Sequence, residues 1–411
     1  MRKSIILIGL ALGASAHGSV YHVESAFPTD QAGNAITPSL GQPFWMTVNY
    51  RTDRSTAGAM VVSAPWLRLA SASFAVGYGA YRATYGPITP LFDGSFPVQV
   101  SIGDATTTVT VTPRSADSAI EYYDPMSWQA SFRSNLTFRA GSKPSVTWLV
   151  PRPESFGFQQ VNVAYSLPSY AISNNVYQQS NPDQSGLDFW ATSSAVRINA
   201  NRLRAASFSD LKKIPSDVKP YTKSEALIES GDKNVKNLVA STLPKKFDKT
   251  MTVYDAAQAL FQATVARLTY VDNPGRQPSA ASALRYGNGD CGFFASVFVA
   301  SCRQAGIPAR PITGFLEGQN EWHVWAEFYV PNAGWVPVDP TFADTLDPNG
   351  DTPLYFGVIP DLNRRVATSI GFDHTVKKYK APILQSPMAF TTASKVSSIS
   401  TTCRLTPASN N

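Results

Sequence analysis

Residues 291–308 read CGFFASVFVASCRQAGIP, an apolar run that begins with a cysteine. Four of its side chains recur at the spacing of one helix face: Phe294, Val297, Phe298 and Cys302. This period predicts a helix that begins at or next to Cys291. Gly306 is a natural residue to end that helix, and Pro308 follows it. The cysteine therefore lies at the start of the helix rather than inside its packed part.

The start of a helix is a place where a thiol can be activated. Free backbone N–H groups and the positive end of the helix dipole both favour a thiolate there. Asp290 is a good N-cap residue for the same helix. These features make Cys291 a candidate nucleophile, with a structural thiol or half of a disulfide as the alternative. The chain has three cysteines, so a pair of Cys302 with Cys403 would leave Cys291 free. The sequence leaves open whether that pair forms.

A thiolate at neutral pH usually needs a basic partner, and histidine is scarce in this chain. Of the four histidines, His323 lies in an alternating stretch, EWHVWAEFYV at 321–330, which predicts a strand. The alternation places His323 and Trp325 on the same face. His323 is therefore the preferred partner of the cysteine, and a histidine that merely packs in a sheet is the alternative.

A carboxylate that orients the imidazole would complete the set. Residues 334–342, GWVPVDPTF, predict a second strand that forms a hairpin with 321–330. Asp339 lies at the end of this strand, because Pro340 cannot continue the ladder. Asp339 is thus the candidate orienting residue, and a plain turn residue is the alternative. The register of the hairpin cannot be read from the sequence.

Cysteine, histidine and aspartate in this order resemble the catalytic set of the transglutaminase-like superfamily, which has a papain-like cysteine fold. The similar segments are GDCGFFASVFVASCRQAGIPARPITGF and WHVWAEFYVPNAGWVPVDPTF. The resemblance implies that Cys291 is the nucleophile, His323 the base and acid, and Asp339 the orienting group. It implies acyl transfer on amide bonds of peptides or proteins through a thioester. Hydrolysis by a protease or amidase is slightly favoured over cross-linking.

Further site residues are expected from the same resemblance. Many members of the superfamily place an aromatic donor near the nucleophile to hold the oxyanion. Tyr286 is the nearest aromatic residue upstream of Cys291 and is the candidate. Apart from the resemblance, Trp322 and Trp325 are candidates for the wall of a substrate groove, and a place in the core is the alternative. No cofactor or metal ion is expected. The acidic loop 344–351, DTLDPNGD, could bind calcium, but it lacks the full spacing of a calcium-binding loop.

The other parts of the chain predict a multidomain protein. Basic residues, an apolar run and small residues in 1–16 have the layout of a secretory signal peptide. Alternating segments predict an immunoglobulin-like β-sandwich module at 17–113 and a second β module at 114–205. Helical periods at 224–243 and 252–271 open an α+β core expected at 206–385, and 386–411 are expected to be a C-terminal tail.

These features set the expected location and partners. The signal segment predicts a secreted or periplasmic protein without a transmembrane anchor after cleavage. The net charge of +6 is modest for 411 residues, and no aromatic pattern accompanies the basic residues, so nucleic acid is not an expected partner. As an alternative to an enzyme, the core could be catalytically silent and the β modules could bind a cell-surface or cell-wall polymer.

Overall fold

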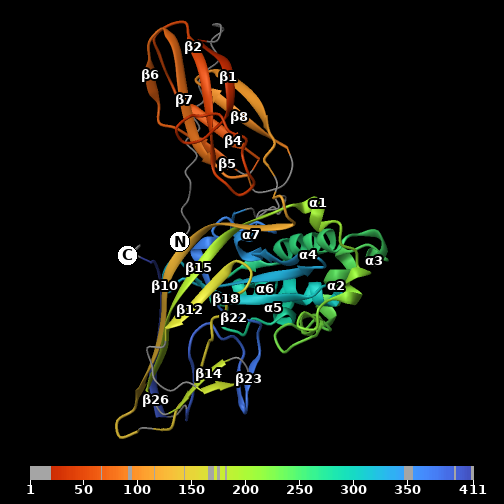
Figure 1. The fold of residues 1–411 in the computed structure, drawn as a ribbon. Helices are drawn as coiled ribbons and strands as arrows, with labels where there is room; N and C mark the ends of the chain where they lie inside the picture. The colour runs from red at the N-terminus through yellow and green to blue at the C-terminus, as the bar shows by residue number, and fades with distance from the viewer. Residues whose placement is uncertain are drawn as a thin grey trace. The chain divides into compact units, whose positions relative to one another are not determined.

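A computed structural model of the chain describes residues 20–408 apart from 66, 91–94, 115, 143, 165–170, 174–175, 181–182, 347–354 and 393–394. The expected signal peptide at 1–16 and most of the acidic loop at 344–351 lie outside the described residues. The fold is mixed α+β, and the chain divides into two units close to residue 113 (Figure 1).

The N-terminal unit consists of antiparallel sheets. Their strand orders are β1-β2-β7, β5-β4-β8-β9 and β3-β6. Strand β8 (Phe96–Ile102) has the alternation that the sequence predicted, because every second residue from Phe96 to Ile102 is buried. The remaining strands are β1 (Tyr21–Thr29), β2 (Phe44–Thr52), β3 (Thr56–Gly58), β4 (Met60–Ala64), β5 (Leu67–Ala70), β6 (Phe74–Val76), β7 (Gly79–Ile88) and β9 (Ala105–Val111).

The larger unit begins with two antiparallel sheets, ordered β12-β15-β10-β26-β19 and β13-β14-β11-β25. They enclose a core of large apolar side chains that includes Trp128, Phe132, Trp148 and Phe189. The strands are β10 (Ile120–Phe138), β11 (Thr147–Val150), β12 (Gln159–Ala164), β13 (Ala171–Ser173), β14 (Val176–Ser180), β15 (Gln184–Ile198), β19 (Gly318–Gln319), β25 (Met388–Phe390) and β26 (Val396–Pro407).

This arrangement differs from the expected domain boundaries. The residues expected as a C-terminal tail form β25 and β26, and β26 pairs with β10 along most of its length. Segment 114–205 is therefore not a separate module, since it shares both sheets with 386–411. Strands β25 and β26 pair with β11 and β10, which lie more than 200 residues earlier in the chain. A local sequence pattern cannot indicate such pairings.

The remaining part of the larger unit is the α+β core. Its main sheet has the order β21-β20-β18-β22, and the other two-stranded sheets are β16-β17 and β23-β24. The elements are α1 (Ala200–Leu203), η1 (Asp210–Lys213), η2 (Lys219–Thr222), α2 (Lys233–Thr242), α3 (Phe247–Thr250), α4 (Val253–Arg267), β16 (Thr269–Tyr270), α5 (Ala280–Tyr286), β17 (Asn288–Gly289), α6 (Cys291–Gln304), β18 (Ala309–Leu316), β20 (Trp322–Val330), β21 (Gly334–Val338), α7 (Pro340–Leu346), η3 (Leu362–Arg364), β22 (Arg365–Ile370), β23 (His374–Val376) and β24 (Tyr379–Ala381).

Helix α6 lies at the centre of this core and packs against β18 and β20. The predicted start at Cys291 is confirmed, and every residue from Gly292 to Arg303 is buried. Gly306 has a φ of +82°, a conformation that favours glycine and ends the helix. The hairpin of β20 and β21 is also confirmed, with Ala326 opposite Val338.

Two helix predictions need adjustment. The segment 252–271 is helical only as far as Arg267, although Thr252 caps it as expected by accepting a hydrogen bond from the Asp255 amide. In 224–243 only the second half is helical, as α2, because Asp232 caps a new helix just after Gly231. None of the described helices has the length and apolar character needed to cross a membrane.

Candidate active site

Cys291 is the first residue of α6, and its side chain is partly exposed. Asp290 caps the helix as predicted, since its Oδ1 accepts a hydrogen bond of 3.0 Å from the Gly292 amide. Gly292 packs closely on Pro278, whose Cβ would lie 2.8 Å from an added side-chain carbon. The sulfur is therefore held at a fixed helix start that a larger residue at 292 would disturb.

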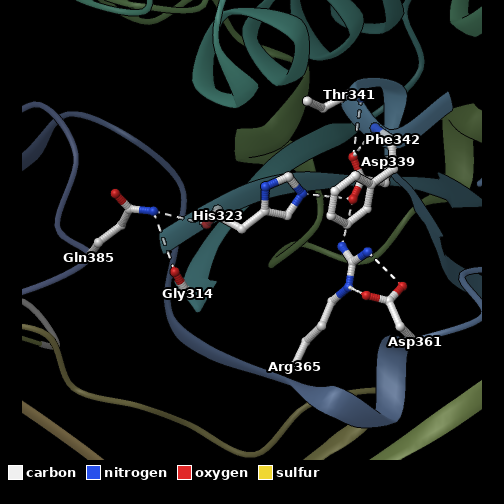
Figure 2. A network of polar contacts seen from close by, with 8 residues as sticks. All are labelled: Gly314, His323, Asp339, Thr341, Phe342, Asp361, Arg365 and Gln385. Carbon is white, nitrogen blue, oxygen red and sulfur yellow. Dashed lines mark hydrogen bonds and ion pairs between the residues drawn. The ribbon is translucent and has the colours of Figure 1, made fainter. Parts of the chain in front are cut away.

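His323 on β20 is held from three sides. Its Nε2 lies 2.7 Å from Oδ2 of Asp339 (Figure 2). The imidazole stacks on Phe342, with 4.8 Å between ring centroids, and on Trp325 at 6.2 Å. The backbone carbonyl accepts a hydrogen bond of 2.9 Å from Nε2 of Gln385. Only 5% of its surface is exposed, and Nδ1, the ring nitrogen that does not face Asp339, points away from the carboxylate (Figure 2).

Asp339 is completely buried at the end of β21. Its Oδ1 accepts hydrogen bonds of 3.2 Å from the amides of Thr341 and Phe342, which belong to the first turn of α7. Its Oδ2 accepts from His323 and, at 2.6 Å, from Nη1 of Arg365. The carboxylate thus accepts four hydrogen bonds. These bonds hold it in place, and it in turn fixes the orientation of the imidazole of His323. The structure brings together the His323 and Asp339 that the sequence paired.

Arg365 is a site residue that the sequence reasoning missed. It opens β22, is completely buried, and forms a second ion pair with Asp361, with Nη2 2.8 Å from Oδ1 (Figure 2). Its guanidinium also lies 5.0 Å from the ring of Phe342. Arg364 and Arg365 are adjacent in the sequence, and no local pattern shows that Arg365 is the buried one. Its place at the start of a strand is the one sign that distinguishes it from Arg364.

The charges around His323 determine its pKa. Burial alone would lower it, but the charge of Asp339, the hydrogen bond to Asp339 and a hydrogen bond to Cys291 together raise the pKa to about 9. Burial would raise the pKa of Asp339, but the charges of His323 and Arg365 hold it well below its usual range. The imidazole therefore carries a proton at neutral pH, beside the sulfur of Cys291.

This pKa shift predicts how stability depends on pH. The folded protein holds the His323 proton up to about pH 9, whereas the unfolded chain releases it near pH 6.5. The pair of protonated His323 and Asp339 therefore stabilises the fold fully below pH 6.5, and this contribution is lost as the pH rises through 9. We expect the free energy of unfolding to fall by roughly 1 kcal/mol per pH unit across this window. Urea titrations at each pH measure it.

The control for this prediction is the variant His323→Gln, which keeps a polar side chain but cannot titrate. Its free energy of unfolding should change much less between pH 6.5 and 9. Equal pH dependence of the two proteins would contradict a raised pKa for His323.

The other expected site residues differ in how far they are buried. Trp325 is completely buried and packs on His323, so it cannot form the wall of a groove. Trp322 is partly buried and packs against the β core beside Phe315, at 5.6 Å between ring centroids. Tyr286 is 61% exposed, and Arg276 lies 4.8 Å above its ring.

A second tyrosine lies on the strand that pairs with the segment just before the nucleophile. Tyr270 on β16 pairs with Gly289, two residues before Cys291. Its pKa is raised by burial and then by the charges of Cys291, Asp272 and Asp290. No local sequence pattern marks Tyr270 as a site residue, because the short parallel pairing of β16 with β17 joins segments that are about 19 residues apart.

The remaining cysteines are free thiols. Cys302 is completely buried in α6, and Cys403 is 2% exposed on β26. The pairing that the sequence left open is therefore not formed in this structure, because the two residues belong to separate layers. Among the described residues, no group of three or more His, Cys, Asp or Glu side chains is arranged to hold a metal ion.

Residues 241–340 match the family model of the transglutaminase-like superfamily, and this span includes Cys291, His323 and Asp339. The chain contains a transglutaminase-like superfamily domain. A protein-glutamine gamma-glutamyltransferase of Pseudomonas aeruginosa is 34% identical over 67 residues, which cover 13% of this chain and 10% of the relative. The uncharacterized protein YebA of Bacillus subtilis is 36% identical over 69 residues, 13% of this chain and 9% of the relative. The matches thus span about a tenth of each relative's length.

Two solved structures are also similar to the chain. One, from Cytophaga hutchinsonii, bears the name "Putative Cysteine Protease" and is 16% identical, with a TM-score of 0.48 over 71% of this chain and 94% of that one. The other is the periplasmic domain of TgpA from Pseudomonas aeruginosa, also 16% identical, with a TM-score of 0.29 over 55% of this chain and 92% of that one.

Proposed function

We propose that the protein is an exported thiol enzyme that cleaves amide bonds of peptides or proteins by acyl transfer. The observation that carries the proposal is the contact of Cys291, at the start of α6, with a buried imidazole whose other nitrogen is held by Asp339. A protonated imidazole beside the sulfur favours the thiolate form of the cysteine, which is the reactive nucleophile. Export is supported by the signal-like segment 1–16.

The reaction would proceed in two steps. The thiolate of Cys291 attacks the amide carbon, and a tetrahedral oxyanion forms. The proton on Nδ1 of His323 then passes to the leaving nitrogen, the C–N bond breaks, and a thioester remains on the sulfur. In the second step His323 takes a proton from water or from an amine as that group attacks the thioester carbon. The acid or new amide leaves, and the cysteine and histidine return to their first state.

Hydrolysis and cross-linking share this machinery and differ in the acceptor. We favour hydrolysis, because no separate site for an amine acceptor stands out around Cys291 among the residues that the structure describes. The choice is tested by mixing the protein with dansylcadaverine and dimethylcasein. Dansyl incorporation indicates transfer, new casein fragments indicate proteolysis, and conversion of glutamine to glutamate without fragments indicates an amidase. The absence of all three products would contradict the proposed function.

The effects of two tyrosine substitutions on kcat can identify the oxyanion donor. We expect Tyr270→Phe to lower kcat on the order of 100-fold, the usual cost of losing one oxyanion donor, because the pairing of β16 with β17 places Tyr270 opposite Gly289, two residues before Cys291. Tyr286→Phe should leave kcat nearly unchanged, because the side chain is largely exposed. Steady-state kinetics on the substrate found above measures both. The reverse order of effects would restore Tyr286 as the donor.

A further inference from the structure

The outer face of the sheet of β12, β15 and β10 carries a second candidate site, distinct from the catalytic residues. A hollow of about 430 Å³ lies on these strands, within the range of roughly 300–1,000 Å³ that is common for small-molecule sites. Trp190 lines it, and 43% of its surface is exposed. In Figure 1 these strands lie on the opposite side of the larger unit from the helices. The exposed part of the indole gives this hollow a flat apolar surface.

Polar side chains surround the tryptophan in two rows. In the first row, Asn162 on β12 and Gln129 on β10 lie directly opposite Trp190 on β15, one on each side. The second row, two residues along the strands and on the same face, contains Gln160, Thr192 and Ser127. Neighbouring strands are about 4.8 Å apart and rows on one face about 7 Å apart. The ring is therefore bordered by amides and hydroxyls over an area close to that of one sugar ring.

These polar groups are available to a ligand. Within the described part of the chain, the side-chain amides of Asn162, Gln129 and Gln160 form no hydrogen bond with another residue. The one side-chain hydrogen bond between members of the two rows is long, at 3.4 Å between the hydroxyls of Ser127 and Thr192. Neither row contains a charged residue. The next row along the strands contains Asp188, which forms an ion pair with Arg133, and Arg404, which donates a hydrogen bond to Gln319. The two rows beside Trp190 therefore present donors and acceptors that carry no charge of their own.

We propose that this face binds a neutral saccharide chain. A pyranose ring has an apolar C–H face that suits a flat indole and a rim of hydroxyls that suits amide and hydroxyl groups. A nucleic acid is disfavoured, because the rows contain no lysine or arginine to neutralise phosphates. An anionic polysaccharide is disfavoured for the same reason. The site is independent of the proposed enzymatic reaction and would place the enzyme on a glycan surface.

The test is affinity electrophoresis of the full chain through native gels that contain hydroxyethyl cellulose, glycol chitin or, as an anionic comparison, heparin. We expect retardation by at least one of the two neutral polymers. Trp190→Ala should weaken it at least tenfold, and Asn162→Ala should weaken it measurably. Tyr78→Ala is the matched control, because Tyr78 is an aromatic residue of the other unit that is 73% exposed.

Circular dichroism and Tm of each variant establish that the fold is retained. If Trp190→Ala does not fold, Asn162→Leu, which alters an exposed strand position, replaces it in the comparison. Retardation by heparin alone, retardation by no polymer, or equal retardation of the wild type and the folded variants would each overturn the proposal. Turnover of a small amide substrate should be the same in Trp190→Ala and the wild type.

Discussion

Replacing Cys291 by alanine is expected to lower the rate of amide turnover by at least four orders of magnitude. The sulfur is the only atom in the site that can form the thioester, and loss of a nucleophile typically costs about 10⁴ to 10⁶ in kcat. The rate of product formation by wild type and variant, with the substrate identified by the casein assay, measures the effect. Mass spectrometry of a slowly hydrolysed acyl donor should show the adduct on Cys291 of the wild type and none on the variant.

Cys302→Ala is the matched control for this loss. It removes a thiol from the same helix, but burial raises the pKa of Cys302 well above its usual range, so this thiol stays protonated and unreactive. The control should retain kcat within about twofold even if its stability falls, because the side chain points into the core. An active Cys291→Ala protein, or equal losses in the two variants, would remove Cys291 from the mechanism.

Replacing Arg365 by methionine is expected to destabilise the fold by roughly 3–5 kcal/mol. The arginine is completely buried and is the cation between two carboxylates, those of Asp339 and Asp361. Burial would lower its pKa, but those two carboxylates raise it above the usual range. Methionine fills a similar volume but leaves Asp339 with a buried charge that only His323 opposes. Urea unfolding of the wild type and the variant at pH 7 measures the loss.

The neighbouring residue supplies the control. Arg364 has 58% of its side chain exposed and forms an ion pair with Glu317, which is itself partly exposed. Arg364→Met should therefore change the free energy of unfolding by no more than about 0.5 kcal/mol. Arg365→Lys should be intermediate, because it keeps the charge but cannot bond both carboxylates. Similar losses for positions 364 and 365 would show that the buried bridge contributes little.

Arg365 also connects the site to the sheets. Its backbone carbonyl accepts a hydrogen bond of 2.6 Å from Ser193 on β15, and Trp128 on β10 donates one of 2.7 Å to the carbonyl of Asn363. Gln159 bonds both backbone groups of Ala367. The strand that holds Asp339 in place is therefore itself held by the β part of the same unit. An excised core would lose these contacts.

The sequence predicted those parts of the site that are encoded locally. The start of α6 follows from Asp290 and an apolar period, and the hairpin that carries His323 follows from alternation and a turn. Both depend on neighbouring residues alone. Tyr270, Arg365 and Gln385 were missed because each reaches the site through pairing or packing between distant segments. The sequence left open whether Trp325 lies in the core or in a groove wall, since alternation gives the face of a strand but not what covers it.

The position of β26 between β10 and β19 in its sheet has a consequence for how the chain acquires its structure. Ser134 and Thr401 are hydrogen-bonded across β10 and β26 although 267 residues separate them in sequence. Until the last strand arrives, β10 presents an open edge to the solvent, where another chain can add. Contacts of such long range are slow to form. Assembly of the larger unit should therefore be late and slow, and nascent or truncated chains should be the species that aggregate or recruit chaperones.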